Sequence, residues 1–214
     1  MIKPGKIFLL LLSMTYCASC FSQEEAPSIA CEPIVKAGKN NRSDINRLVD
    51  LIKSKDLLQC RWNDQKSGFA KKTDSLMKIT TLQEKQELFN DSSTILRYYL
   101  FPAILYENDS LAFELLTKDI NDSAELVAFC ACMIDDTPIN LRLLNFYYSF
   151  IWLKYQNGYG GTIEGFAFSF KHGNKSVRDN KKWKQKVTAL KNLMAHNTPA
   201  YELEKPGSWA LKRK

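Results

Sequence analysis

Apolar residues recur at helical spacing along most of this chain, and they predict a succession of short helices. The first predicted helix begins at Ser43 and places Ile45, Leu48, Val49 and Ile52 on one face. Further helices are predicted over residues 71–80, 81–89, 94–106, 111–118, 124–134, 138–156 and 177–195. Because the connections between them are short, successive helices should lie antiparallel to one another.

Polar residues mark the expected helix starts. Thr81 is followed three residues later by Glu84, which is the spacing of a capping box. The triplet Asn-Asp-Ser occurs at 90–92, 108–110 and 121–123, each time ahead of an apolar run, so we expect three N-caps made by Asp and Ser side chains. Thr137 and Pro138 predict a fourth start, with a capping threonine and a proline in the first turn.

The segment 139–153 is apolar around most of the circumference of its predicted helix. This pattern is typical of a central core helix. Four polar side chains argue against a membrane span: Arg142, Asn145, Ser149 and Lys154. The final helix carries a narrower apolar stripe, formed by Trp183, Val187, Leu190 and Met194.

Residues 157–176 interrupt the helical pattern. Glycines at 158, 160 and 161 predict a helix stop followed by a flexible turn, and they lack the preceding strand that a dinucleotide-binding motif requires. Phe166, Phe168 and Phe170 then alternate with small residues, as in a short strand or a hairpin that closes at residues 172–174.

Together these elements predict a mainly α fold, either an irregular helical bundle or a short stack of helical hairpins, with a small loop or β-like insert near 158–173. The Asn-Asp-Ser spacings of 18 and 13 residues match no helical repeat family. The predicted organisation is a signal peptide (1–22), an extended segment (23–42), a helical core (43–157), a Gly/Phe-rich insert (158–176) and a basic C-terminal helix and tail (177–214).

The first 22 residues indicate export. Lys3 and Lys6 precede an apolar run over 7–12 and a small-residue exit, and the run is too short to anchor the chain in a bilayer. This leader resembles those of bacterial envelope proteins in which a glutamine opens the mature chain. A lipoprotein leader acylated at Cys20 is the alternative. Because Cys17 stands where such leaders carry an aliphatic residue, we favour cleavage near Ser22 and a periplasmic or secreted product.

Charge is distributed unevenly along the 214 residues. The net charge is +7, yet residues 171–214 contain 12 Lys or Arg and only 3 acidic residues, and the leader adds two lysines. Residues 23–170 therefore carry a net charge of −4. An acidic body with a basic end suggests an anionic partner, and the expected compartment excludes nucleic acid.

Four cysteines remain after the leader. Cys31 and Cys60 are the pair we expect to form a disulfide in an oxidising compartment. Cys130 and Cys132 fall in a predicted helix, where they would project about 200° apart and could not bridge each other, so we expect them to be buried apolar residues. With two histidines in the chain and no second close cysteine pair, neither a metal site nor a cofactor is predicted.

Candidate functional residues are few. Glu164 is the one candidate for a general acid, between two glycine-rich turns, and it would need a second carboxylate or a histidine opposite it. Tyr159 is a candidate contact residue in the glycine turn. Lys181, Lys182 and Lys184 are candidate contacts for an anionic partner, although we favour the interpretation that they form a solvated helix face.

The sequence thus favours an exported, non-catalytic interaction protein of the bacterial cell envelope. An immunity or inhibitor protein that blocks an envelope-acting toxin or hydrolase is one concrete form. The alternatives are a small hydrolase acting on an envelope polymer, with Glu164 as the acid and Tyr159 lining the site, and a general envelope-associated ligand-binding protein. The partner would be a protein or an anionic envelope component.

Overall fold

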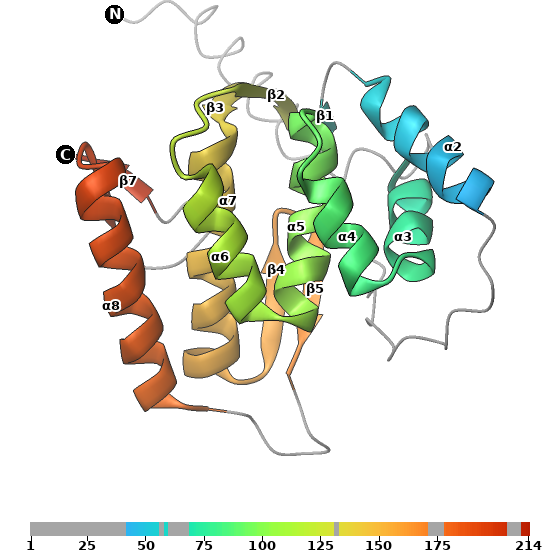
Figure 1. Ribbon diagram of the computed structural model, residues 1–214. Helices are drawn as coiled ribbons and strands as arrows, with labels where there is room; N and C mark the ends of the chain where they lie inside the picture. Colours follow the sequence, from blue (N-terminus) through green and yellow to red (C-terminus); the bar gives the residue numbers. More distant parts are fainter. Residues whose placement is uncertain (1–41, 56–57, 60–68, 131–132, 171–177, 205–210) are drawn as a thin grey trace, which may run out of the picture.

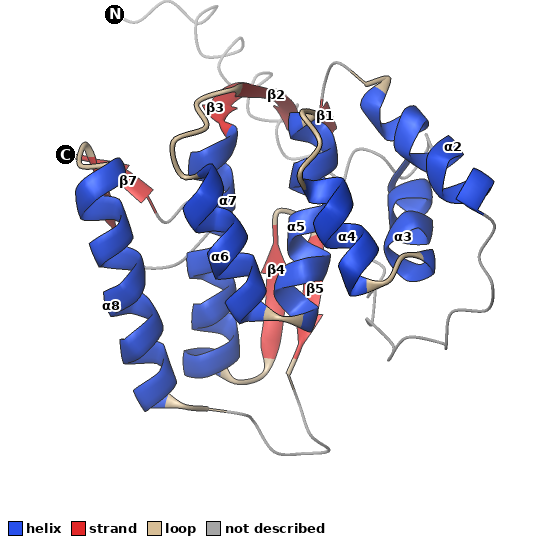
Figure 2. Cartoon of the chain, in the orientation of Figure 1, coloured by secondary structure: helices blue, strands red, loops and turns tan. Residues whose placement is uncertain are grey.

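The computed structural model describes residues 42–55, 58–59, 69–130, 133–170, 178–204 and 211–214, and it is mainly helical (Figures 1 and 2). The helices, in chain order, are α2 (Arg42–Lys53), α3 (Phe69–Ile79), α4 (Leu82–Phe89), α5 (Thr94–Glu107), α6 (Asp109–Asp119), α7 (Ile139–Trp152) and α8 (Asn180–Asn197). A π-helical turn, η2 (Leu153–Asn157), extends α7. The predicted fold class, mainly α with a small β insert, is confirmed.

Helix α7 forms the centre of the molecule. Every residue from Ile139 to Ile151 is buried, because α5, α6 and α8 pack against it from different sides. Aromatic rings meet at two of these interfaces. The ring centroids of Phe113 in α6 and Tyr147 lie 5.3 Å apart, and those of Trp183 in α8 and Tyr148, which stack, lie 5.7 Å apart. In Figure 1, α8 stands at one side of the molecule and α2 and α3 lie at the other. The prediction of a central core helix is confirmed.

The other predicted apolar faces are also found in the core. Ile45, Leu48, Val49 and Ile52 of α2 are buried. On α8, Leu190 and Met194 are buried, and Trp183 and Val187 pack against the core while remaining partly exposed. Pro102 lies inside α5, which continues to Glu107 without ending there.

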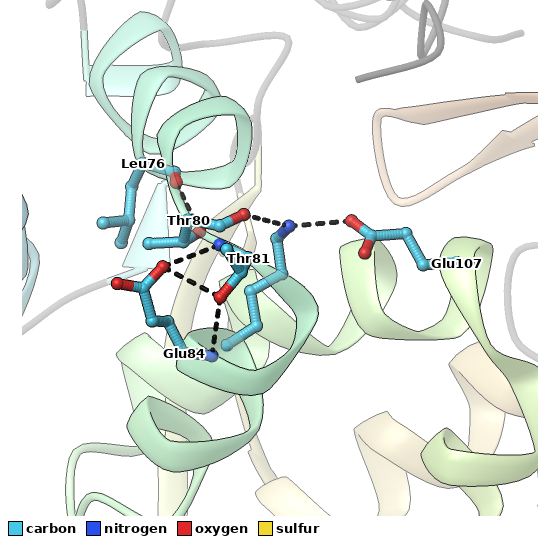
Figure 3. Close-up of polar contacts among 6 residues, drawn as sticks. Leu76, Thr80, Thr81, Glu84 and Glu107 are labelled. Carbon is cyan, nitrogen blue, oxygen red and sulfur yellow. Dashed lines mark hydrogen bonds and ion pairs between the residues drawn. The ribbon is translucent and has the colours of Figure 1, made fainter. Parts of the chain in front are cut away.

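The capping box at the start of α4 is present as predicted. Thr81 Oγ1 accepts a hydrogen bond from the backbone N–H of Glu84, and the Glu84 carboxylate accepts one from the Thr81 backbone at 2.8 Å (Figure 3). This second bond is the main reason that the pKa of Glu84 lies below its ordinary value. Each side chain thus accepts from a backbone N–H that the first turn of the helix leaves without an intrahelical partner.

Beside this cap lies an ion pair with a buried lysine, which the sequence did not predict. The side chain of Lys85 has no exposed area, and its Nζ donates to Thr80 O and to Glu107 Oε1, both at 2.7 Å (Figure 3). The pair joins the start of α4 to the last residue of α5. A second ion pair, between Arg97 of α5 and Asp119, joins α5 to the end of α6.

The three Asn-Asp-Ser triplets do not all cap helices. At the second, Asn108 is the N-cap of α6, accepting from the N–H groups of Ser110 and Leu111. At the first, Ser93 caps α5 and Asp91 supports it by accepting from the Ser93 N–H. At the third, Asp122 accepts from Ala124 N ahead of a strand. The prediction that Asp or Ser of each triplet caps a helix is therefore wrong. The two caps found are Ser93, which follows the first triplet, and Asn108, the first residue of the second.

The helix predicted over 124–134 is wrong. This segment instead forms β2 (Glu125–Cys130), which pairs antiparallel with β3 (Met133–Pro138) and parallel with β1 (Leu58–Gln59). Exposed Glu125, buried Leu126 and half-buried Val127 alternate as strand residues do, and the apolar run was too short to separate helix from strand. Because β3 includes Thr137 and Pro138, the predicted cap there is also wrong, and α7 begins at Ile139 with no side-chain cap.

The cysteine arguments change accordingly. Cys130 ends a strand, so the helical geometry that kept it from bridging Cys132 does not apply. Cys31, Cys60 and Cys132 lie outside the described residues, and the predicted bond between Cys31 and Cys60 stays a prediction.

Two further hairpins complete the fold. Strand β4 (Gly160–Ile163) pairs with β5 (Phe166–Ser169), and β6 (Tyr201–Leu203) pairs with β7 (Leu211–Arg213). The β4–β5 hairpin packs between α5 and α7 with Phe166 and Phe168 buried (Figure 1). It turns at residues 164–165. The turn was predicted at residues 172–174, which lie outside the described part of the chain. Among the described residues, no helix has the length and apolar character needed to cross a membrane.

We expect Thr81→Ala to lower the free energy of unfolding by about 1 kcal/mol, because the first turn of α4 loses one partner and Glu84 loses its hydroxyl contact. Urea unfolding at pH 7 measures the change. The matched control is Thr117→Ala, which removes an exposed threonine from within α6; a loss as large as that of Thr81→Ala would show that the cap is not the cause.

Candidate anion-binding surface

The start of α8 carries an unusual charge pattern. Asp179 is the N-cap and accepts from Lys182 N at 2.9 Å, while the first turn of the helix contains no acidic residue. Lys181, Lys182 and Lys184 are all exposed there. The amino end of a helix is its positive end, so cations at this end reduce helix stability. Asp179 offsets part of this cost, because it caps the helix and its carboxylate also lies 3.7 Å from Lys182 Nζ.

The glycine turn after α7 lies against the same end of α8. Arg178 Nε donates to Asn157 O at 3.2 Å, and Asp179 N donates to Tyr155 O at 3.0 Å. Tyr159 follows Asn157 by two residues and is 45% exposed, the one large apolar side chain with that exposure in the described part of the chain. The structure therefore brings Tyr159 and the predicted lysines to one end of the molecule.

The turn that carries Tyr159 is closely packed. Asn157 Nδ2 donates to Gly160 O at 3.0 Å, and the φ angle of Gly160 is +109°. A Cβ atom at Gly160 would lie only 2.0 Å from Phe168 O, so no other residue fits there. These contacts hold the backbone on both sides of Tyr159.

Partly buried cations lie beneath the exposed ones. The Asp109 carboxylate accepts from Tyr155 Oη at 2.7 Å and faces Lys186 Nζ at 3.2 Å and Lys154 Nζ at 3.8 Å. Burial alone would raise the pKa of Asp109, but the Tyr155 hydroxyl and the two ammonium groups hold it below its ordinary value. One carboxylate thus balances two lysines, which leaves the cluster with a positive charge.

Repulsion among the lysines is visible in Lys154. Burial lowers the pKa of the Lys154 amine, and the charges of Lys186 and Lys182 lower it further while Asp109 opposes them. A bound anion would relieve this repulsion. We call the exposed residues Arg178, Lys181, Lys182 and Lys184 the α8 cation surface.

Glu164 lies elsewhere and faces inward. Its Oε2 accepts from Tyr98 Oη at 2.6 Å and faces Arg142 Nη1 at 3.5 Å, while Oε1 accepts from Asn145 Nδ2 at 3.3 Å. Burial raises the pKa of Tyr98 well above its ordinary range, and the Glu164 charge adds to this, so the phenol remains a donor. The side chains against Glu164 thus include a phenol, a guanidinium and an amide.

Tyr159 and Glu164 do not share a site. The strand β4 separates them, and at about 3.3 Å per residue their Cα atoms are roughly 15 Å apart. Within the described residues, no group of three or more His, Cys, Asp or Glu side chains could hold a metal ion.

Sequence reasoning missed Lys154, Lys186 and Asp109, and also the partners of Glu164. The missing signal for Glu164 was the spacing of Arg142 and Asn145, which lie one turn apart on a mostly apolar helix. Polar residues at that spacing require a polar partner from another element. No protein-family profile, curated protein or solved structure matches this chain.

We expect Asp109→Asn to destabilise the protein by about 2 kcal/mol at pH 7, because it leaves Lys154 and Lys186 without their shared anion. The pKa of Asp109 is depressed in the folded state, so its contribution is complete above the ordinary value of 3.8 and is lost as the pH falls through the folded pKa. Urea unfolding of both forms should therefore show a difference that shrinks below about pH 4.

The control for this prediction is Glu114→Gln, which removes one negative charge from an exposed position of the same helix. It should change stability by less than about 0.5 kcal/mol. A difference between wild type and Asp109→Asn that does not depend on pH would contradict the electrostatic explanation.

Proposed function

We propose that this chain is an exported, non-catalytic binding protein of the bacterial cell envelope, which holds an acidic protein surface against its α8 cation surface. The observation that carries the proposal is the set of lysines placed at the positive end of α8, where they lower helix stability. Residues that break a local stability rule in this way are candidates for function. An immunity or inhibitor protein is the specific form that we favour.

The surrounding geometry supports a binding role. Exposed Tyr159 supplies apolar area beside the cations, on a turn whose backbone is held by hydrogen bonds before binding. An aromatic side chain with a nearby cationic rim is a common composition for a protein interface. The surplus of positive charge would also increase the rate of encounter with an acidic partner.

The hydrolase alternative receives less support. It required Glu164 to face a second acid or a histidine, with Tyr159 in the same site. Glu164 instead accepts from Tyr98 and Asn145 and faces Arg142, and Tyr159 lies at the far end of β4.

The test is charge reversal at Lys181, Lys182 and Lys184. The variant K181E/K182E/K184E should lose the partner that the mature wild type captures from an envelope extract, as identified by mass spectrometry. Its thermal midpoint should change little, because glutamates at the amino end of a helix are favourable and this gain offsets the loss of the ion pair between Lys182 and Asp179. Binding would thus be lost without a matching loss of stability.

The matched control is K71E/K72E/K78E, which makes the same change in net charge at exposed positions of α3. It should retain the partner. Raising the salt concentration from about 50 to 300 mM should weaken capture by the wild type, since screening shortens the range of the attraction. Retention of the partner by the α8 variant, or equal loss with the α3 control, would contradict the proposal.

Export makes a separate prediction. The protein isolated from an envelope fraction of its native host should have the mass of a chain that begins at about Gln23. Mass spectrometry of the intact protein measures this directly and also detects acylation at Cys20. Full-length protein confined to the cytosol would rule out the proposed location and, with it, the envelope partner.

A further inference from the structure

The turn between β4 and β5 contains a residue that turn geometry alone does not favour. Glu164 and Gly165 are the two central residues, with φ angles of +46° and +84°. Two-residue hairpin turns with positive φ at both positions prefer asparagine followed by glycine. A glutamate is strained at this φ angle, because its Cβ crowds the backbone. Its side chain must therefore provide a compensating interaction.

The side chain provides it by reaching a set of donors on two helices. Tyr98 comes from α5, while Arg142 and Asn145 come from consecutive turns of α7. Together they engage both carboxylate oxygens of Glu164. All three donors belong to buried residues.

The donors are held in place by packing that does not involve Glu164. The Tyr98 ring makes edge contacts with Tyr99 and Phe146, at 5.4 and 6.1 Å between ring centroids. Arg142 and Asn145 are themselves buried on α7, the central helix. A site whose donors are positioned beforehand binds its ligand without reorganisation.

We propose that Tyr98, Arg142 and Asn145 form a carboxylate-binding site, which the chain fills with its own Glu164 and which a small monocarboxylate can occupy in its place. One cationic donor and two neutral donors match the charge and the two oxygens of a single carboxylate. The β4–β5 turn is then an internal ligand. This inference does not rest on the α8 cation surface or on the proposed function.

The first experiment removes the internal ligand with Glu164→Gly. Glycine suits the positive φ angle, so the turn is preserved while the carboxylate is lost. In sodium chloride, the thermal midpoint should fall below that of the wild type. Sodium acetate at equal ionic strength should raise it again with a saturable concentration dependence, while acetamide, which has the same shape and no charge, should not.

Glu164→Asn separates the carboxylate from the turn. Asparagine is the preferred residue at this turn position, but its side chain is one methylene shorter and uncharged. The variant should be less stable than the wild type if the carboxylate matters, and equally or more stable if only the turn matters. The second result would overturn the proposal.

The wild type tests whether an external carboxylate can displace Glu164. Acetate should accelerate amide hydrogen exchange at Phe166 and Phe168 of β5, relative to chloride at the same ionic strength, and leave the amides of α4 unchanged. If Glu164→Gly does not fold in chloride, its refolding yield from urea in acetate and in chloride gives the same comparison. Equal effects of acetate and chloride on the variant, or unchanged exchange in the wild type, would overturn the proposal.

Discussion

The burial of α7 is the constraint on which the rest of the structure depends. Its residues from Ile139 to Ile151 are shielded from water on all sides, so each covering element must match the part of α7 that it contacts. Aromatic rings from α6, α8 and β5 cover the apolar parts. Arg142 and Asn145 need polar partners, since burying a charged or polar side chain without a partner is costly. The Glu164 turn meets that need.

The same helix also connects the interior to the candidate surface. At Leu153 the α-helical spacing of α7 widens into a π-helical turn, which ends at Gly158 in a left-handed conformation. Lys154 and Tyr155 lie in this turn and meet Asp109 of α6. The segment then runs along the start of α8 and presents Tyr159. Interior packing and the arrangement of surface charge therefore share one continuous stretch of chain.

The sequence predicted those features that depend on local chemistry. The capping box at Thr81, the buried face of α2 and the all-round burial of α7 could be predicted because each arises within one turn or one helix face. The strand at 125–130 could not, because its pairing partners decide its conformation and its apolar run suits either state. Tyr159 and the lysines of α8 were identified as separate candidates, and the backbone and side-chain contacts between residues 155–157 and 178–180 bring them together. The pairing of Glu164 with α5 and α7, and that of Lys85 with Glu107, joins residues that are distant in sequence, so no pattern around either residue identified its partner.

The parallel pairing of β1 with β2 has a consequence for how the chain folds. Leu58 lies opposite Ala128, so two strands that are 70 residues apart in sequence must meet. Closing a loop of that length costs about 4 kcal/mol of chain entropy, and a ladder of two residues returns only part of it. This pairing should therefore form late, after α3 to α6 have collapsed and shortened the effective loop. Among the described elements, β1 should then be the last to join the fold and the first to leave it.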